Sequence, residues 1–210
     1  MTDYTITLFD SKPELSLLRF VELKHHLWAE DYPHFFRSRA SICAVENKGL
    51  YAVMLSEEPC PKAVCTNRDE PVYRDSCMEL FFQPFADDLR YMNFEINPRG
   101  AYLSEVGTMR GDRKFIKEIT ETEPEVTVLP VENGWGVVLF IPEQLVSQVF
   151  GRAFSVAETE YIRANFYKCG EETDSPHFSS AFPVCTPAPD FHRPEYFEKL
   201  YIDTVRKELL

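Results

Sequence analysis

Residues 91–97 read YMNFEIN, and this stretch decides the fold. Apolar and polar side chains alternate strictly in it, so Met, Phe and Ile share one face while Tyr, Asn and Glu share the other. Such alternation predicts a β-strand with one buried and one polar face. The turn sequence Asn-Pro-Arg-Gly at 97–100 follows it and predicts a hairpin with a second strand at 101–106.

Two more segments, 77–83 and 161–168, alternate in the same way. The first places Glu79 on one face, and the second places Asn165 on the face that also carries Tyr and Arg. Three strands therefore each offer polar side chains on one face. That face is either a surface that hydrogen-bonds sugar hydroxyl groups or the ordinary solvent-exposed face of an antiparallel sheet.

Turn signals divide the rest of the chain into short segments. Asn and Gly predict hairpin turns at 47–49 and 132–134. The sequence predicts a strand at 62–66, a long loop at 174–193, and a short helix that begins just after Pro142. About ten short strands without an alternating βαβ pattern favour an all-β fold.

The predicted architecture is a jelly-roll-like antiparallel β-sandwich of two sheets with one or two short helices. Helix is expected to take up less than about a fifth of the chain. The length of 210 residues predicts one domain, residues 1–210, whose tail at 204–210 is frayed or helical.

Composition narrows the function. The chain has 34 acidic and 22 basic residues, a net charge of −12, which argues against nucleic acid and anionic membrane surfaces as partners. No apolar run approaches the ~20 residues of a membrane span. The N-terminal sequence Met-Thr-Asp-Tyr lacks the features of a secretory leader, which predicts a cytoplasmic protein whose six cysteines are free thiols.

Several blocks of sequence, in order along the chain, resemble one known family. They read PVYRDSCMELFFQP at 71–84, YMNFEIN at 91–97, FIP at 140–142, RANFYKCG at 163–170, PHF at 176–178 and PDFHRPEYF at 189–197. They resemble the carbohydrate-binding family 9-like domains and cover most of residues 28–203. The resemblance implies a β-sandwich that binds saccharides without catalysis, that is often attached to glycoside hydrolases, and that carries structural calcium.

The resemblance also implies a ligand site. Tyr73 resembles an aromatic residue that flanks the ligand, Glu79 an acid that binds hydroxyl groups, Arg99 a basic contact and Asn165 a strand amide that contacts sugar. The loop 177–182 completes this predicted site. It contributes His177, and its rings Phe178 or Phe182 replace the family tryptophan, at whose position this chain has Ala181.

Three alternatives are compatible with the sequence. The replaced tryptophan is compatible with an accessory or interaction domain that has lost sugar binding. Glu79 and Glu95 share a face, so a glycoside hydrolase with a carboxylate pair is the less favoured reading. Asp87 and Asp88 are candidate calcium ligands, or simply a solvated hairpin tip. The expected partners are a saccharide and a glycoside hydrolase or another sugar-processing protein.

Overall fold

The computed structural model describes residues 4–26 and 28–203, and 41% of these residues are in strands. The single α-helix of the described ranges is α1, Glu143–Phe150. The strands are β1 Thr5–Phe9, β2 Val21–Glu22, β3 Ser38–Val45, β4 Gly49–Ser56, β5 Cys77–Gln83, β6 Tyr91–Ile96, β7 Tyr102–Gly107, β8 Lys114–Phe115, β9 Glu125–Val131, β10 Gly134–Pro142, β11 Tyr161–Gly170, β12 His177–Ser180 and β13 Glu198–Asp203. One-turn 3₁₀ helices span Leu15–Leu17, Val72–Arg74, Ile116–Glu118 and Pro194–Tyr196. The prediction of a mostly β chain with little helix is confirmed.

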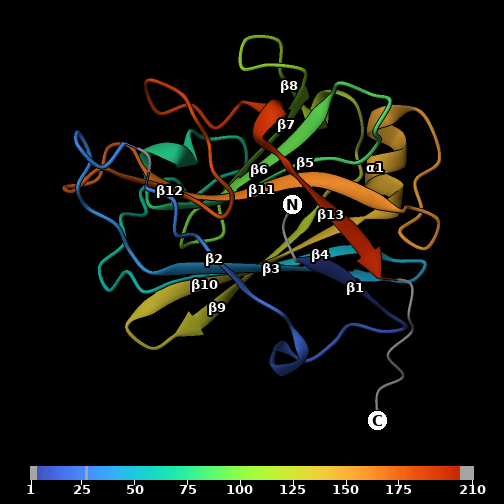
Figure 1. Ribbon diagram of the computed structural model, residues 1–210, viewed down its shortest axis with the longest axis horizontal. Coiled ribbons are helices and arrows are strands. Elements are labelled where there is room, and N and C mark those ends of the chain that lie inside the picture. Colours follow the sequence, from blue (N-terminus) through green and yellow to red (C-terminus); the bar gives the residue numbers. More distant parts are fainter. Residues whose placement is uncertain (1–3, 27, 204–210) are drawn as a thin grey trace.

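The strands form one continuous mixed sheet, in the order β8-β7-β6-β5-β11-β13-β1-β3-β4-β10-β9. This sheet curls into two layers, with β5, β6, β7 and β11 in one and β3, β4, β9 and β10 in the other (Figure 1). The prediction of two antiparallel sheets is wrong. β1 pairs in parallel with both β13 and β3, and so joins the two layers. Side-chain alternation is the same in parallel and antiparallel strands, so it could not reveal this seam.

The main core lies between the two layers. Met92, Phe94 and Ile96 of β6 are fully buried there, which confirms the core face predicted from their alternation. A second apolar cluster covers the outer face of β5, β6 and β11, and it includes Phe81 and Tyr167. Loops close over this second cluster, so the predicted polar face is not a plain solvent-exposed surface.

The predicted hairpin turns are confirmed. β3 and β4 pair across 46–48, and β9 and β10 pair across 132–133. Asn47 and Asn133 adopt positive φ angles of 58° and 56°, the left-handed conformation that asparagine tolerates well. α1 begins directly after Pro142 and ends at Gly151, as expected from Pro at the start and Gly at the end of a helix.

Two local predictions are wrong. Residues 62–66 form no strand, because the Asp75 carboxylate accepts hydrogen bonds from the amides of Val64 and Cys65, both at 2.9 Å, and holds this segment as a loop. The expected loop at 174–193 contains β12, which pairs with β11. The predicted tail at 204–210 lies outside the described residues. Across the described ranges, helices are too short to cross a membrane.

Candidate functional site

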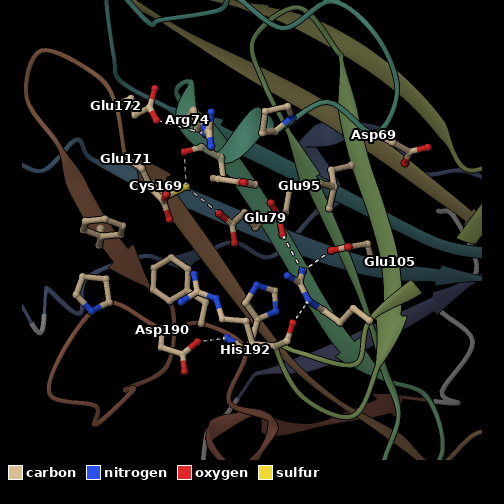
Figure 2. Close-up of a pocket in the computed structure, with 18 of the residues that line it drawn as sticks. Asp69, Arg74, Glu79, Glu95, Glu105, Cys169, Glu171, Glu172, Asp190 and His192 are labelled. Atoms are coloured by element: carbon tan, nitrogen blue, oxygen red, sulfur yellow. Dashed lines mark hydrogen bonds and ion pairs between the residues drawn. The ribbon is translucent and has the colours of Figure 1, made fainter. Parts of the chain in front are cut away.

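A cavity of about 530 Å³ opens on the outer face of the layer that contains β5, β6, β7 and β11. Strand residues form its floor, and residues from 69–74, 110–115 and 189–192 line its sides (Figure 2). Its charged lining is mostly acidic: Asp69, Glu79, Glu95, Glu105, Glu171, Glu172 and Asp190, with Arg74, Arg110 and Arg113. An excess of carboxyl groups makes this cavity unfavourable for anionic ligands.

Two carboxyl groups lie side by side on the floor. Glu79 of β5 and Glu95 of β6 are directly paired across the strands, and each is only 3% exposed. Glu79 accepts a hydrogen bond from the Cys169 thiol at 2.9 Å, and Glu95 accepts one from Asn93 at 3.1 Å. Burial raises the pKa of Glu79 well above its ordinary value and raises the pKa of Glu95 to about 8. Burial therefore favours the neutral form of both carboxyl groups.

Arg113 lies beside Glu95 on this floor. Its guanidinium forms an ion pair with Glu105 of β7 and lies 3.9 Å from Glu95. Asn93 donates a second hydrogen bond, at 3.3 Å, to the same Glu105 carboxylate. Because Arg113 and Asn93 both connect Glu95 with Glu105, this side of the floor is held in one arrangement.

Aromatic rings form the opposite side. Phe191 stacks on Tyr167 at 4.1 Å between ring centroids, and Phe178 packs beside Phe191 at 6.1 Å. The neighbouring His192 hydrogen-bonds through Nδ1 to the Tyr91 hydroxyl at 2.9 Å. Burial lowers the pKa of His192 to about 2, so this ring is neutral at physiological pH. The cavity thus combines apolar rings with neutral and charged hydrogen-bonding groups.

Three of the seven predicted site residues line this cavity: Tyr73, Glu79 and Phe178. Tyr73 lies in the 3₁₀ turn Val72–Arg74 just before β5, and it is half-buried at the edge of the second apolar cluster. The structure therefore brings a ring from this turn and a ring from β12 to the same cavity as the buried Glu79.

The other four predicted residues do not line it. Asn165 is fully buried on the same face as Glu79, where its side chain donates to the Phe182 carbonyl at 3.0 Å and accepts from the Phe182 amide at 3.1 Å. Phe182 belongs to the main core. His177 contacts the buried Lys168 ammonium instead. Arg99 is exposed in its turn, outside the lining. The structure therefore places these four side chains outside the lining of this cavity.

Sequence reasoning missed several lining residues. The alternation of residues 91–97 predicts the face on which Glu95 lies. Arg113 and His192, in contrast, come from loops whose positions no periodicity predicts. His177 and His192 both belong to the segment 174–193 that the sequence predicts as one long loop. The structure separates them. His177 lies on β12 and contacts Lys168, whereas His192 packs against Phe81 with 4.7 Å between the ring centroids. The sequence signal available for Phe191 and His192 was their place in the family block 189–197.

The residues proposed for calcium do not fit that ion. Asp87 accepts two hydrogen bonds from Arg152, and Asp88 accepts two from the Arg90 side chain, so both carboxylates are neutralised by guanidinium groups. Calcium prefers six to eight oxygen ligands. Within residues 4–26 and 28–203, three metal-ligating side chains of the His, Cys, Asp and Glu types converge at Cys77, Glu79 and Cys169, and two of these are thiols.

The fold and the cavity define a β-sandwich module with an open, ring-lined polar binding cavity. The chain belongs to carbohydrate-binding family 9, whose family model matches residues 11–202. Among curated proteins, none matches the chain.

Solved structures with the same fold include three relevant neighbours. A crystal structure from Bacteroides uniformis ATCC 8492, of a protein for which carbohydrate binding is proposed, superposes with a TM-score of 0.78. It is 25% identical and the match covers 95% of this chain and 97% of that one. Two structures of a family 9 carbohydrate-binding module from Caldicellulosiruptor kristjanssonii, 8% identical, have TM-scores of 0.67 with cellotriose and 0.64 with glucose. Their matches cover 98% of this chain and 97% and 98% of theirs.

Proposed function

We propose that this protein binds a neutral saccharide, without catalysis, in the cavity over β5 and β6. The observation that carries the proposal is the joint placement of the Tyr73 and Phe178 rings beside the buried carboxyl group of Glu79. Rings pack against the C–H face of a sugar, while polar groups hydrogen-bond its hydroxyl groups. Membership of carbohydrate-binding family 9 and the two neighbours solved with cellotriose and glucose support the same assignment.

Burial raises the pKa of Glu79 and Glu95, and the neutral form that this favours suits hydroxyl groups. A protonated carboxyl group is both a donor and an acceptor, so Glu79 and Glu95 each offer both functions to a ligand. Arg110, which also lines the cavity, adds guanidinium donors. This donor and acceptor set matches a hydroxyl-rich ligand better than a phosphate or a carboxylate, which the surrounding acidic residues repel.

The carboxylate pair supports binding rather than hydrolysis. A glycosidase needs one ionised carboxylate beside one protonated acid. Burial raises the pKa of both Glu79 and Glu95, which disfavours the ionised member that such a pair needs. A module of this kind leaves the glycosidic bond intact, and we extend the proposal to a role in carbohydrate catabolism beside a separate glycoside hydrolase.

Titration calorimetry with cellotriose and glucose tests the proposal. We expect Tyr73→Ala and Glu79→Ala each to weaken saccharide binding by about tenfold, which corresponds to about 1.4 kcal/mol. The matched controls are Tyr201→Ala, an exposed ring on β13, and Glu125→Ala, an exposed acid on β9; neither lines the cavity. Both controls should bind like the unmodified protein.

Three outcomes would contradict the proposal. The first is equal saccharide affinity in Tyr73→Ala and the unmodified protein, with both proteins folded by circular dichroism. The second is release of shorter sugars when the protein is incubated with cellotriose, which would favour the hydrolase alternative. The third is absence of binding across a wide panel of neutral glycans, which would favour the alternative of an accessory domain that has lost sugar binding.

A further inference from the structure

Two thiols and one carboxyl group meet on the floor of the cavity. Cys77 of β5 and Cys169 of β11 are directly paired across the strands, and Glu79 follows Cys77 by two residues on the same face. Their exposed fractions are 0%, 2% and 3%. The two sulfur atoms and one carboxylate oxygen all lie within 4.8 Å of one another (Figure 2 labels Cys169 and Glu79).

The strand register brings these ligand atoms together. Two positions come from one strand at a spacing of two, and the third comes from the directly opposite position of the neighbouring strand. Ladder hydrogen bonds fix both backbones, so a shared ion needs only small side-chain rotations. The Cys169 thiol already hydrogen-bonds Glu79 at 2.9 Å and lies 3.6 Å from the Tyr73 carbonyl oxygen.

The donor set selects the class of ion. Thiolate sulfur favours Zn²⁺ and other thiophilic cations, whereas calcium and magnesium require a shell of oxygen atoms. Zn²⁺ is four-coordinate in most proteins, and sites with three protein ligands keep the fourth position for water or a ligand atom. Three ligands are present at this site.

The cavity provides both the entry path and the open position. Glu79 and Cys169 line the cavity, while Cys77 is fully enclosed behind them. An ion held by the three groups therefore has its free side toward the cavity space.

We propose that Cys77, Glu79 and Cys169 bind one Zn²⁺ ion, or another thiophilic divalent cation, with its fourth coordination position open to the cavity. This site is separate in chemistry from the proposed saccharide function, although both use Glu79. A water molecule or a hydroxyl oxygen is the ligand that the open position accepts.

Cobalt titration of the full-length protein tests the site. The protein is reduced with a phosphine, freed of metal with a chelator, and titrated with Co²⁺ alone, without saccharide. We expect one equivalent to bind, with a thiolate-to-cobalt charge-transfer band in the near ultraviolet that Zn²⁺ abolishes. Cys77→Ser/Cys169→Ser should lose the band and at least about tenfold in affinity, while Cys60→Ser/Cys185→Ser, which changes two exposed thiols, should keep both.

X-ray absorption of the zinc-loaded unmodified protein gives a second test that needs no variant. We expect two sulfur neighbours at about 2.3 Å and oxygen neighbours at about 2.0–2.2 Å. A shell without sulfur, no cobalt band, or an unchanged band in folded Cys77→Ser/Cys169→Ser overturns the proposed metal site. Tyr73→Ala should bind Co²⁺ normally, so a failure of the metal site is distinguishable from a failure of saccharide binding.

Discussion

Lys168 is a charged side chain buried at the base of the sheet layer that carries the cavity. It is 0% exposed, and its ammonium group lies 3.1 Å from the Glu58 carboxylate and 3.0 Å from the Cys169 carbonyl oxygen. Glu58 also accepts hydrogen bonds from Trp135 at 2.9 Å and from Ser76 at 2.6 Å. The buried pair thus has partners on all sides, which is the condition for tolerating ions in a core.

Replacement of Lys168 by Met should destabilise the fold strongly. The variant leaves the Glu58 carboxylate buried without its cation, and breaking a buried pair in this way costs about 3–5 kcal/mol. The matched control is Lys48→Met at an exposed turn, where a change within about 0.5 kcal/mol is expected. Urea unfolding measures both variants. Equal free energies of unfolding for Lys168→Met and the unmodified protein would contradict the structural role of this pair.

His192 should make the protein sensitive to acid. Burial lowers the pKa of His192 to about 2, whereas the histidine of an unfolded chain titrates near about 6.5. Between these values only the unfolded chain binds the proton, so stability falls as pH decreases, by up to about 1.4 kcal/mol per pH unit. The raised pKa values of Glu79 and Glu95 have the opposite effect on stability. The folded state binds these protons more tightly than the unfolded chain does, so this contribution to stability rises as pH decreases.

A variant isolates the histidine contribution. The His192→Gln variant cannot take up this proton. Between pH 7 and about pH 5, its free energy of unfolding should therefore fall by about 1–2 kcal/mol less than that of the unmodified protein. Urea unfolding at the two pH values gives the difference, in which the carboxyl contributions cancel. Parallel losses in the two proteins would show that His192 is not buried in its neutral form.

At the scale of single residues, the sequence indicated which side chains lie near the site better than it indicated which segments pack around each of them. The family resemblance pointed to Glu79 and Tyr73, and both line the cavity, where a strand and the turn just before it hold them. Asn165 lies on the same face by alternation. Its side-chain amide, however, is buried and hydrogen-bonds the backbone of Phe182. Which polar side chain a loop covers depends on contacts between distant parts of the chain, and periodicity does not encode them.

The hairpin between β3 and β4 depends on Gly49. This residue has φ of +147°, and a Cβ atom on it would lie 2.1 Å from the Ile141 carbonyl oxygen of β10. Gly49→Ala should therefore lower the free energy of unfolding by more than about 1 kcal/mol. Gly111→Ala is the matched control, because nothing lies within 4 Å of its added Cβ. Thermal unfolding that ranks the two variants equally would argue against this close packing of β10 on the turn.

At the scale of elements, sequence predicted hairpins well and long-range pairings poorly. The turns at 47–49 and 132–134 have local signals, and so have the paired strands β5 and β6. The parallel pairing of β1 with β13 joins residues about 196 positions apart, Thr5 with Tyr201, and no local signal marks it. The short β12 was hidden in a loop rich in Pro, Ser and aromatic residues.

For the whole molecule, net charge should set which glycans bind. The chain has a net charge of −12 and the cavity lining is mostly acidic. Binding of neutral cellotriose should change less than about twofold between about 0.05 M and about 0.5 M salt, because no net charge on the ligand is screened. A sulfated glucan of similar size should not bind at low salt. Calorimetry at both salt concentrations checks this, and tight, salt-sensitive binding of the sulfated glucan would contradict it.

The seam at β1 also orders the events of biosynthesis. The layer that contains β3, β4, β9 and β10 is complete once residue 142 has left the ribosome. The cavity floor must wait for β11, which brings Cys169 opposite Cys77, and β1 lacks its second neighbour until β13 has been made. At about 5–20 residues per second, the nascent chain spends seconds with an open strand edge on β1. A stalled or shortened transcript that ends before β13 therefore yields a polypeptide with a ready template for aggregation.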